Sequence, residues 1–248
     1  NDFNFDELIN LIKTLNEQVE KIKSSELEIE TKSDLSPLTI ADTYVNQHLC
    51  NFVKKTKYKN IISEEITNLA FSERKNWDKY WVIDPIDGTK EFIKKSTDYT
   101  INIALCEGNK PIFGLVSCPA NNQIYHAFRN KGAFLNNKKI TTCKETKKNI
   151  MRVIASKSHM NEDTFKYIED LKKDFDIELK SYGSSLKICK IAEGEADIYP
   201  RFGPTMEWDT CAAQIILEEA GGKFRSSNGQ MVIYNKENLL NPFFIAEG

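Results

Sequence analysis

The stretch WVIDPIDGT (81–89) has the clearest chemical content in the sequence. Its apolar start predicts a strand that delivers Asp84 at its tip. Pro85 is expected to stop the strand ladder, and Gly88 to allow a tight turn that brings Asp87 back toward Asp84. Two carboxylates in one small volume repel each other unless a cation lies between them. This stretch therefore favours a site for a hard metal ion, with magnesium preferred over zinc.

The same letters also fit a turn without a metal. Asp-Pro and Asp-Gly pairs are common in turns, and an isolated Asp-x-x-Asp is more often a solvated loop than a metal site. Glu64 follows an apolar pair and, taken alone, fits an exposed strand edge. Asp209 lies near the start of an apolar segment, where acidic residues commonly cap helices. The metal hypothesis therefore needs support from the pattern of the whole chain.

The composition indicates a folded chain without a general affinity for nucleic acid polymers. Its 248 residues are 40% hydrophobic and 28% charged, and a formal net charge of −2 gives no attractive field for polyanions. The six cysteines form no CxxC pair and the three histidines are scattered, so we expect free thiols in a reducing compartment and no zinc centre. No apolar run has the length of a transmembrane helix and the first residues do not form a signal peptide, which makes the cytoplasm the expected location.

The first half of the chain predicts two helices on one mainly antiparallel sheet. Apolar residues at helical spacing predict an amphipathic helix over 5–24, and Thr39 with Asp42 has the pattern of a capping box that begins a second helix. Segments rich in β-branched and aromatic residues predict strands over 80–134. The letters AFLNNKKI predict a tight hairpin that turns at the Asn-Asn pair.

The polar, basic run 141–149 is the best candidate for a boundary, and we divide the chain into 1–145 and 146–248. After it, strands alternate with helices, which implies a second sheet sandwiched by helices. The helices are expected over about 161–175, 184–193 and 207–220. The expected fold class is α/β, with an α+β first half that carries most acidic candidates and an α/β second half.

The joint pattern resembles the lithium-sensitive, magnesium-dependent phosphomonoesterases of the inositol monophosphatase superfamily. The resemblance rests on DPIDGT, on the preceding KSDLSPLTIAD and on the following GSSLK. The phrases DGTKEFI, YTINIALCEG, GSSLKICKIAEGEADIYPRFGPTMEWDT and LNPFF are similar to its CysQ-type 3'(2'),5'-bisphosphate nucleotidases. The likeness covers roughly residues 32–244. It implies the layered αβαβα sandwich of the inositol monophosphatase and fructose-1,6-bisphosphatase type.

The resemblance implies that acidic residues hold Mg2+ ions. A first ion would be bound by Glu64, Asp84 and the backbone carbonyl of Ile86. A second ion would be bound by Asp84, Asp87 and Asp209, with Asp84 shared between the two. Such ions neutralise phosphoryl oxygens and activate water, so the set suits hydrolysis of a phosphate ester without a covalent enzyme intermediate.

The resemblance further implies catalytic roles for Asp42 and Thr89, and counts Glu64 with them. The Thr89 hydroxyl would contact the attacking water, and Asp42 would accept its proton. The capping role of Asp42 can coexist with this catalytic role. Gly88 and Thr89 also offer backbone N–H groups to the phosphate.

Contacts to the rest of the substrate are implied mainly in the second half. The expected substrate-binding residues are Ser158, His159, Gly183, Ser184, Lys187 and Arg201, together with Glu64, Ile86, Asp87, Gly88, Thr89 and Asp209. Lys187 and Arg201 are the cations best suited to a second phosphate, although a surface salt bridge fits each of them equally well. Lys32 and Asp34 are weaker candidates for the mouth of the site.

The reaction that the resemblance implies is hydrolysis of 3'-phosphoadenosine 5'-phosphate to AMP and phosphate. The expected partner is thus a small nucleotide bisphosphate, and the expected role is removal of a by-product of sulfate activation. An inositol monophosphatase or broad sugar phosphatase is the alternative within the same chemistry, and a non-catalytic nucleotide sensor is the alternative from another class. The sequence leaves open monomer against homodimer, and peripheral contact with the cytoplasmic face of the inner membrane.

Overall fold

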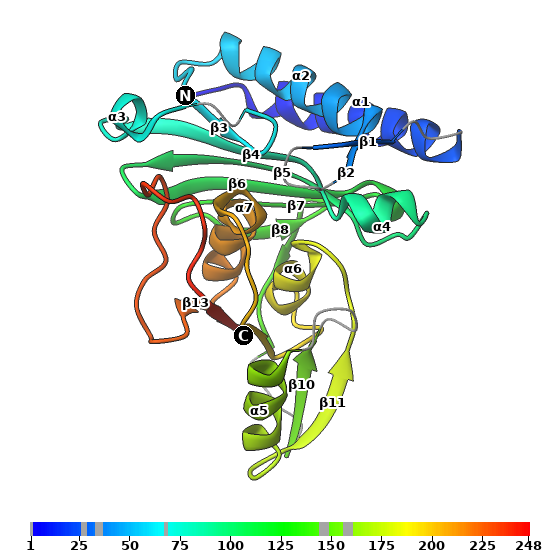
Figure 1. Cartoon of the computed structure of the whole chain (residues 1–248), viewed down its shortest axis with the longest axis vertical. Helices are drawn as coiled ribbons and strands as arrows, with labels where there is room; N and C mark the ends of the chain where they lie inside the picture. Colours follow the sequence, from blue (N-terminus) through cyan, green and yellow to red (C-terminus); the bar gives the residue numbers. More distant parts are fainter. Residues whose placement is uncertain (1, 26–28, 33–36, 67–68, 144–148, 156–160) are drawn as a thin grey trace.

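A seven-stranded sheet and a five-stranded sheet organise the chain, and helices cover and separate them (Figure 1). The computed structural model describes residues 2–25, 29–32, 37–66, 69–143, 149–155 and 161–248. From one side of the molecule to the other, the layers are two helices, the large sheet, two helices, the small sheet and one helix. The predicted α/β class and αβαβα sandwich are confirmed.

Two long helices cover the outer face of the large sheet, as the sequence predicts. They are α1 (Phe5–Ser24) and α2 (Ile40–Lys55). The Thr39 and Asp42 capping box begins α2, which confirms that prediction. The apolar faces of both helices pack with Trp81 and its neighbours on the sheet in one core.

The large sheet is antiparallel except for its first pair of strands, which is parallel. In spatial order its strands are β3 (Ile61–Ser63), β4 (Lys79–Asp87), β5 (Thr100–Glu107), β6 (Lys110–Cys118), β7 (Gln123–Phe128), β8 (Gly132–Leu135) and β9 (Lys138–Ile140). The predicted hairpin is present between β8 and β9, and Asn136 and Asn137 both have positive φ, at 46° and 65°.

The smaller elements are the hairpin β1 (Ile29–Thr31) and β2 (Pro37–Thr39), the helices α3 (Phe71–Arg74) and α4 (Thr89–Ile93), and a 3-10 turn (Pro119–Asn121).

Strand β4 continues past Pro85, so the prediction that the ladder stops there was wrong. Asp84 pairs with Asn102 of β5 and Asp87 pairs with Thr100, with a shift of register between the two pairs. This bulge accommodates the proline, which has no N–H for the ladder. Three steps along β4 match two steps along β5. The two aspartates therefore lie on one face of the sheet, whereas a regular strand would place them on opposite faces.

The small sheet and its helices come from the second half of the chain. Its elements in chain order are β10 (Ile150–Ile154), α5 (Glu162–Leu171), β11 (Asp176–Lys180), α6 (Leu186–Ala192), β12 (Ile198–Arg201), α7 (Glu207–Glu219), β13 (Lys223–Ser226) and β14 (Phe244–Glu247). The strand order is β11-β10-β12-β14-β13, with the first two pairs parallel and the others antiparallel. This confirms the predicted alternation of strands and helices.

Helices α6 and α7 lie between the two sheets, and α5 covers the far face of the small sheet. The core around α6 and α7 includes buried side chains from both sheets. The large sheet ends at Ile140 and the small sheet begins at Ile150, on either side of the predicted boundary. The division into 1–145 and 146–248 stays a prediction. Among the described helices, none combines the length and apolar character needed to cross a membrane.

Candidate metal and phosphate site

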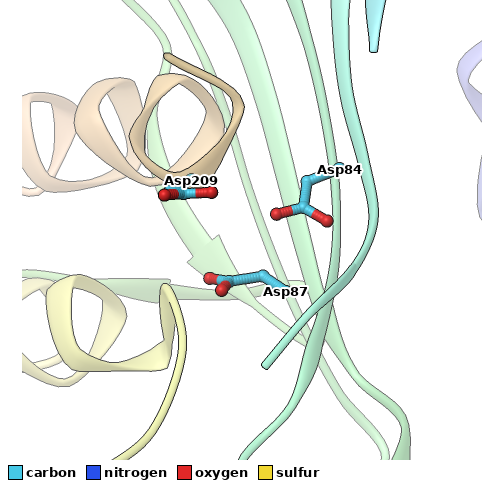
Figure 2. Close-up of side chains that lie close together, drawn as sticks. All are labelled: Asp84, Asp87 and Asp209. Atoms are coloured by element: carbon cyan, nitrogen blue, oxygen red, sulfur yellow. The ribbon is translucent and has the colours of Figure 1, made fainter. Parts of the chain in front are cut away.

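Three carboxylates meet where β4 faces the beginning of α7 (Figure 2). Asp84, Asp87 and Asp209 each offer one oxygen, and these oxygens all lie within 4.8 Å of one another. Figure 2 shows the side chains directed into one shared space between strand and helix. Asp209 also accepts a hydrogen bond from the N–H of Met206 at 2.8 Å, so the helix-capping role and membership of the cluster coexist.

The electrostatics of this cluster fit a cation. Burial, and then repulsion from Glu64, Asp87 and Asp209, raises the pKa of Asp84 well above its usual range. Burial raises the pKa of Asp209 to about 6, although the N–H of Met206 opposes the shift. The Oδ1 atom of Asp84 is buried and has no hydrogen-bond partner within the described residues. A hard divalent cation supplies the missing partner and removes the repulsion, so oxygen ligands of this kind suit Mg2+.

Asp87 is tied to the second half of the chain by a charge and by a backbone hydrogen bond. Burial and repulsion from Asp209 raise its pKa to about 8, and the charge of Lys187 and the N–H of Ser185 oppose the shift. That N–H donates to Oδ2 of Asp87 at 2.5 Å. No sequence pattern indicated this contact, although Ser185 lies in the GSSLK motif. The orientation of Asp87 thus depends on the turn that precedes α6.

Glu64 lies beside the three aspartates but is bound to a lysine. It follows β3, and its hydrogen bond and charge both contribute to the raised pKa of Asp84. The Nζ atom of Lys32 lies 2.8 Å from Oε1 of Glu64 and 2.6 Å from Oε1 of Glu65. Burial alone would lower the pKa of Lys32, but the hydrogen bonds to both glutamates raise it. Lys32, a weak candidate from sequence, is therefore a direct partner of an expected metal ligand. Asp34 lies outside the described residues.

The Asp42 and Thr89 side chains meet next to the aspartates. Oδ2 of Asp42 accepts hydrogen bonds from the backbone N–H of Thr39 at 2.8 Å and from its hydroxyl at 2.5 Å. Oδ1 of Asp42 lies 3.3 Å from the Thr89 hydroxyl, which can also donate to the carbonyl of Ile86 at 3.1 Å. Burial raises the pKa of Asp42 to about 6, against the effect of its bonds to Thr39. The structure thus brings this pair together as the resemblance implies.

A cavity of about 340 Å³ adjoins the carboxylates. Asp87, Gly88 and Asp209 line it from the cluster side, and Gly88, at φ 88°, turns the chain into α4. Four predicted substrate residues also line it: Gly183, Ser184, Lys187 and Arg201. Lining residues that the sequence did not indicate are Glu91, Asp98, Ser181, Tyr182, Ser185, Ile188, Tyr199, Thr205, Thr210 and Phe244. The predicted residues Ser158 and His159 lie outside the described part of the chain.

The two predicted phosphate cations line the cavity without an ion pair to any described residue. Within the described ranges, neither Lys187 nor Arg201 has a carboxylate at ion-pair distance. The Nζ atom of Lys187 donates to the carbonyl of Ser184 at 3.3 Å and lies 5.6 Å from the centre of the Tyr199 ring. The Nε atom of Arg201 is buried and has no partner among these residues. Both cations therefore remain available to an anionic ligand.

Comparison with known proteins relates most of the chain to one family. The sequence model of the inositol monophosphatase family matches residues 4–243. The 3'(2'),5'-bisphosphate nucleotidase CysQ of Salmonella typhimurium is 36% identical over 222 residues, which are 88% of this chain and 88% of the relative. The crystal structure of CysQ from Bacteroides thetaiotaomicron is 34% identical with a TM-score of 0.85, and covers 96% of this chain and 97% of that one. An IMPase/NADP phosphatase complexed with Mg2+ and phosphate shares the fold, with a TM-score of 0.81, 24% identity, and 98% and 89% of the two chains covered.

Proposed function

Because the chain belongs to the inositol monophosphatase family, we propose that it hydrolyses 3'-phosphoadenosine 5'-phosphate to AMP and phosphate with the aid of Mg2+. The observation that carries this proposal is one cavity lined both by Asp87 and Asp209 of the carboxylate cluster and by Lys187 and Arg201, which have no carboxylate at ion-pair distance among the described residues. The cluster suits the phosphate that is cleaved, and the cations suit a second phosphate on the same molecule. Similarity to CysQ nucleotidases at about 35% identity supports the same substrate class.

The metal ions would be held by Asp84, Asp87 and Asp209, with Glu64 and the carbonyl of Ile86 completing the set. When bound, Mg2+ neutralises charge on the phosphoryl group, lowers the pKa of water and stabilises the departing oxygen. To hold a cation, Glu64 would have to give up its ion pair with Lys32. The Ile86 carbonyl lies 3.1 Å from the Thr89 hydroxyl, and it would be available as a ligand when that hydroxyl donates to Asp42 instead.

Asp42 and Thr89 would accept the proton of the attacking water through a two-step transfer. When the Thr89 hydroxyl donates to Oδ1 of Asp42, its lone pairs are free to accept from a water molecule. The water proton then moves to Thr89, and the Thr89 proton moves to Asp42. A carboxylate with a pKa of about 6 suits this task, because it is mostly ionised at neutral pH and still basic enough to accept a proton.

Specificity would come from Lys187 and Arg201. Lys187 is only 9% exposed, so its charge acts with little screening by water. Arg201 can add directional donors toward phosphate oxygens, including the Nε–H group, which has no partner among the described residues. Inositol monophosphate has no second phosphate to use these groups. With this substrate, the enzyme would act in sulfur metabolism in the cytoplasm.

Phosphate release with Mg2+ tests the proposal. Rates would be compared for 3'-phosphoadenosine 5'-phosphate, inositol 1-phosphate and fructose 1,6-bisphosphate. We expect kcat/KM to favour the nucleotide by about tenfold or more. A preference for either sugar phosphate would overturn the substrate assignment. Tight nucleotide binding without turnover of any of the three would instead support a sensor.

A further inference from the structure

We infer that three buried side chains, Thr100, Asn102 and Ser185, position Asp87 for metal binding. Their exposed fractions are 0%, 1% and 3%, and they join β5 of the large sheet to the turn before α6. None of them is an expected metal ligand. The inference rests on the proposed function, because it assumes that Asp87 binds a metal ion.

The three side chains form a closed ring of hydrogen bonds. The Ser185 hydroxyl lies 2.6 Å from Oδ1 of Asn102 and 2.8 Å from the Thr100 hydroxyl, and Nδ2 of Asn102 lies 3.1 Å from the Thr100 hydroxyl. Only one direction of donation satisfies all three contacts. Ser185 donates to Asn102, Asn102 donates to Thr100, and Thr100 donates to Ser185. Each hydroxyl then donates once and accepts once, so the loss of one member leaves the others unsatisfied.

The ring lies beside the metal cluster, on the same face of the large sheet. Thr100 is the register partner of Asp87, and Asn102 is the register partner of Asp84 across the bulge of β4. On the other side, the backbone N–H of Ser185 donates to Oδ2 of Asp87. Asp87 is therefore held by its own strand and by a donor whose place is set by the ring.

A second contact joins the same turn to the loop that precedes β5. Gly183 donates its N–H to Oδ2 of Asp98 at 2.9 Å, and a Cβ at Gly183 would lie only 2.5 Å from the carbonyl oxygen of Asp98. This contact lies two residues before Ser185 and does not reach Asp87. It holds the turn in place, while the ring fixes the position of the Ser185 N–H. Loss of the ring is thus expected to change the orientation of Asp87 without releasing the turn.

Two pairs of variants separate positioning from general stability. Thr100→Val removes the hydroxyl at nearly constant volume, and Thr100→Ser retains it. Ser185→Ala removes the second hydroxyl while keeping the backbone donor. Its matched control is Ser117→Ala, since Ser117 is 0% exposed on the same sheet and donates to Oδ1 of Asn16 at 2.9 Å on the outer face.

The measurements are Mg2+ binding by titration calorimetry without substrate, the Mg2+ dependence of phosphate release, and thermal unfolding. Thr100→Val and Ser185→Ala are expected to weaken Mg2+ binding by about tenfold, as substitutions of groups that orient metal ligands typically do. Thr100→Ser and Ser117→Ala should retain the wild-type affinity. If Ser185→Ala does not fold, Thr100→Val still decides the question.

The outcomes distinguish this inference from the function on which it rests. Unchanged Mg2+ affinity in Thr100→Val, with a loss of thermal stability like that of Ser117→Ala, would show that the ring only supports the fold. A wild-type protein that binds no Mg2+ would instead refute the proposed function. A wild-type protein that binds Mg2+ while both ring variants bind it weakly would establish the positioning role.

Discussion

The hydroxyl of Thr89 lies 3.3 Å from Oδ1 of Asp42, although 47 positions separate the two residues in the chain. Asp42 uses its other oxygen to cap α2 through Thr39. One carboxylate therefore has a structural oxygen and an oxygen that faces the candidate site. The cap fixes the carboxylate plane, and this directs the second oxygen toward Thr89 before any substrate binds.

Asp42→Asn should remove the proton acceptor while retaining an oxygen for the cap. We expect kcat to fall by about 100-fold or more, in the range typical for loss of a general base, with Mg2+ affinity little changed. The measurement is kcat at saturating Mg2+ and nucleotide.

Asn4→Ala is a control for the Asp42→Asn variant. It removes the cap of α1, in which the Asn4 side chain accepts a hydrogen bond of 3.2 Å from the N–H of Glu7. It should lower stability by about 1 kcal/mol and leave kcat near that of the wild type. An Asp42→Asn variant with nearly normal kcat would exclude Asp42 as the base.

Asp87→Asn should have opposite effects on activity and on metal-free stability. At neutral pH the carboxyl must take up a proton to fold into the crowded cluster, whereas the amide is already neutral, so thermal stability in EDTA should equal or exceed that of the wild type. The same change weakens the metal set, so turnover should fall by about 100-fold or more. Unfolding curves with EDTA and with Mg2+ would show whether the variant has lost the stabilisation by Mg2+. Nearly normal turnover at saturating Mg2+ would remove Asp87 from the site.

The raised carboxylate pKa values predict how metal-free stability depends on pH. The pKa is about 6 for Asp42 and Asp209 and about 8 for Asp87, in each case above the usual range of aspartate. As the pH rises, the unfolded state therefore loses these protons at a lower pH than the native state does. This contribution to stability is complete below the unfolded pKa and is lost as the pH rises through about 6 and then about 8.

The corresponding measurement is the melting temperature in EDTA from pH 5 to pH 9. The difference between wild type and Asp87→Asn reports the titration of Asp87 together with its effect on the neighbouring carboxyl of Asp84. The wild type should lose stability relative to the variant as the pH approaches 8, and Mg2+ should reverse that trend since it binds the ionised carboxylates. A difference that stays constant across this range would contradict the raised pKa of Asp87.

Local patterns were sufficient to predict the helices and strands that position the site. The apolar spacing of α1, the capping box of α2 and the two Asn residues of the hairpin between β8 and β9 all act within a few residues, and each was confirmed. The prediction for Pro85 failed because a bulge, whose form depends on the neighbouring strand, replaced the expected stop. That bulge, rather than a strand end, places Asp84 and Asp87 on one face.

Contacts between distant segments could not be predicted from the sequence. The bond from the Ser185 N–H to Asp87 joins residues 98 positions apart and uses a backbone donor, which has no signature of its own. The ion pair of Lys32 with Glu64 depends on where the segment after β1 lies relative to β3. Residue type indicated which groups could bind metal or phosphate, whereas their orientation is set by tertiary contacts.

Lys187 and Arg201 should distinguish a nucleotide bisphosphate from a monophosphate. Lys187→Met and Arg201→Ala are each expected to lower kcat/KM for 3'-phosphoadenosine 5'-phosphate by about 10-fold to 100-fold, the usual effect of losing a hydrogen bond to a charged group. The rate with inositol 1-phosphate should change much less, because that substrate lacks the second phosphate. Arg201→Lys should recover only part of the loss, since an ammonium group cannot replace the planar guanidinium fork. Equal losses for both substrates would show that these cations act on the cleaved phosphate or on the fold, and not on specificity.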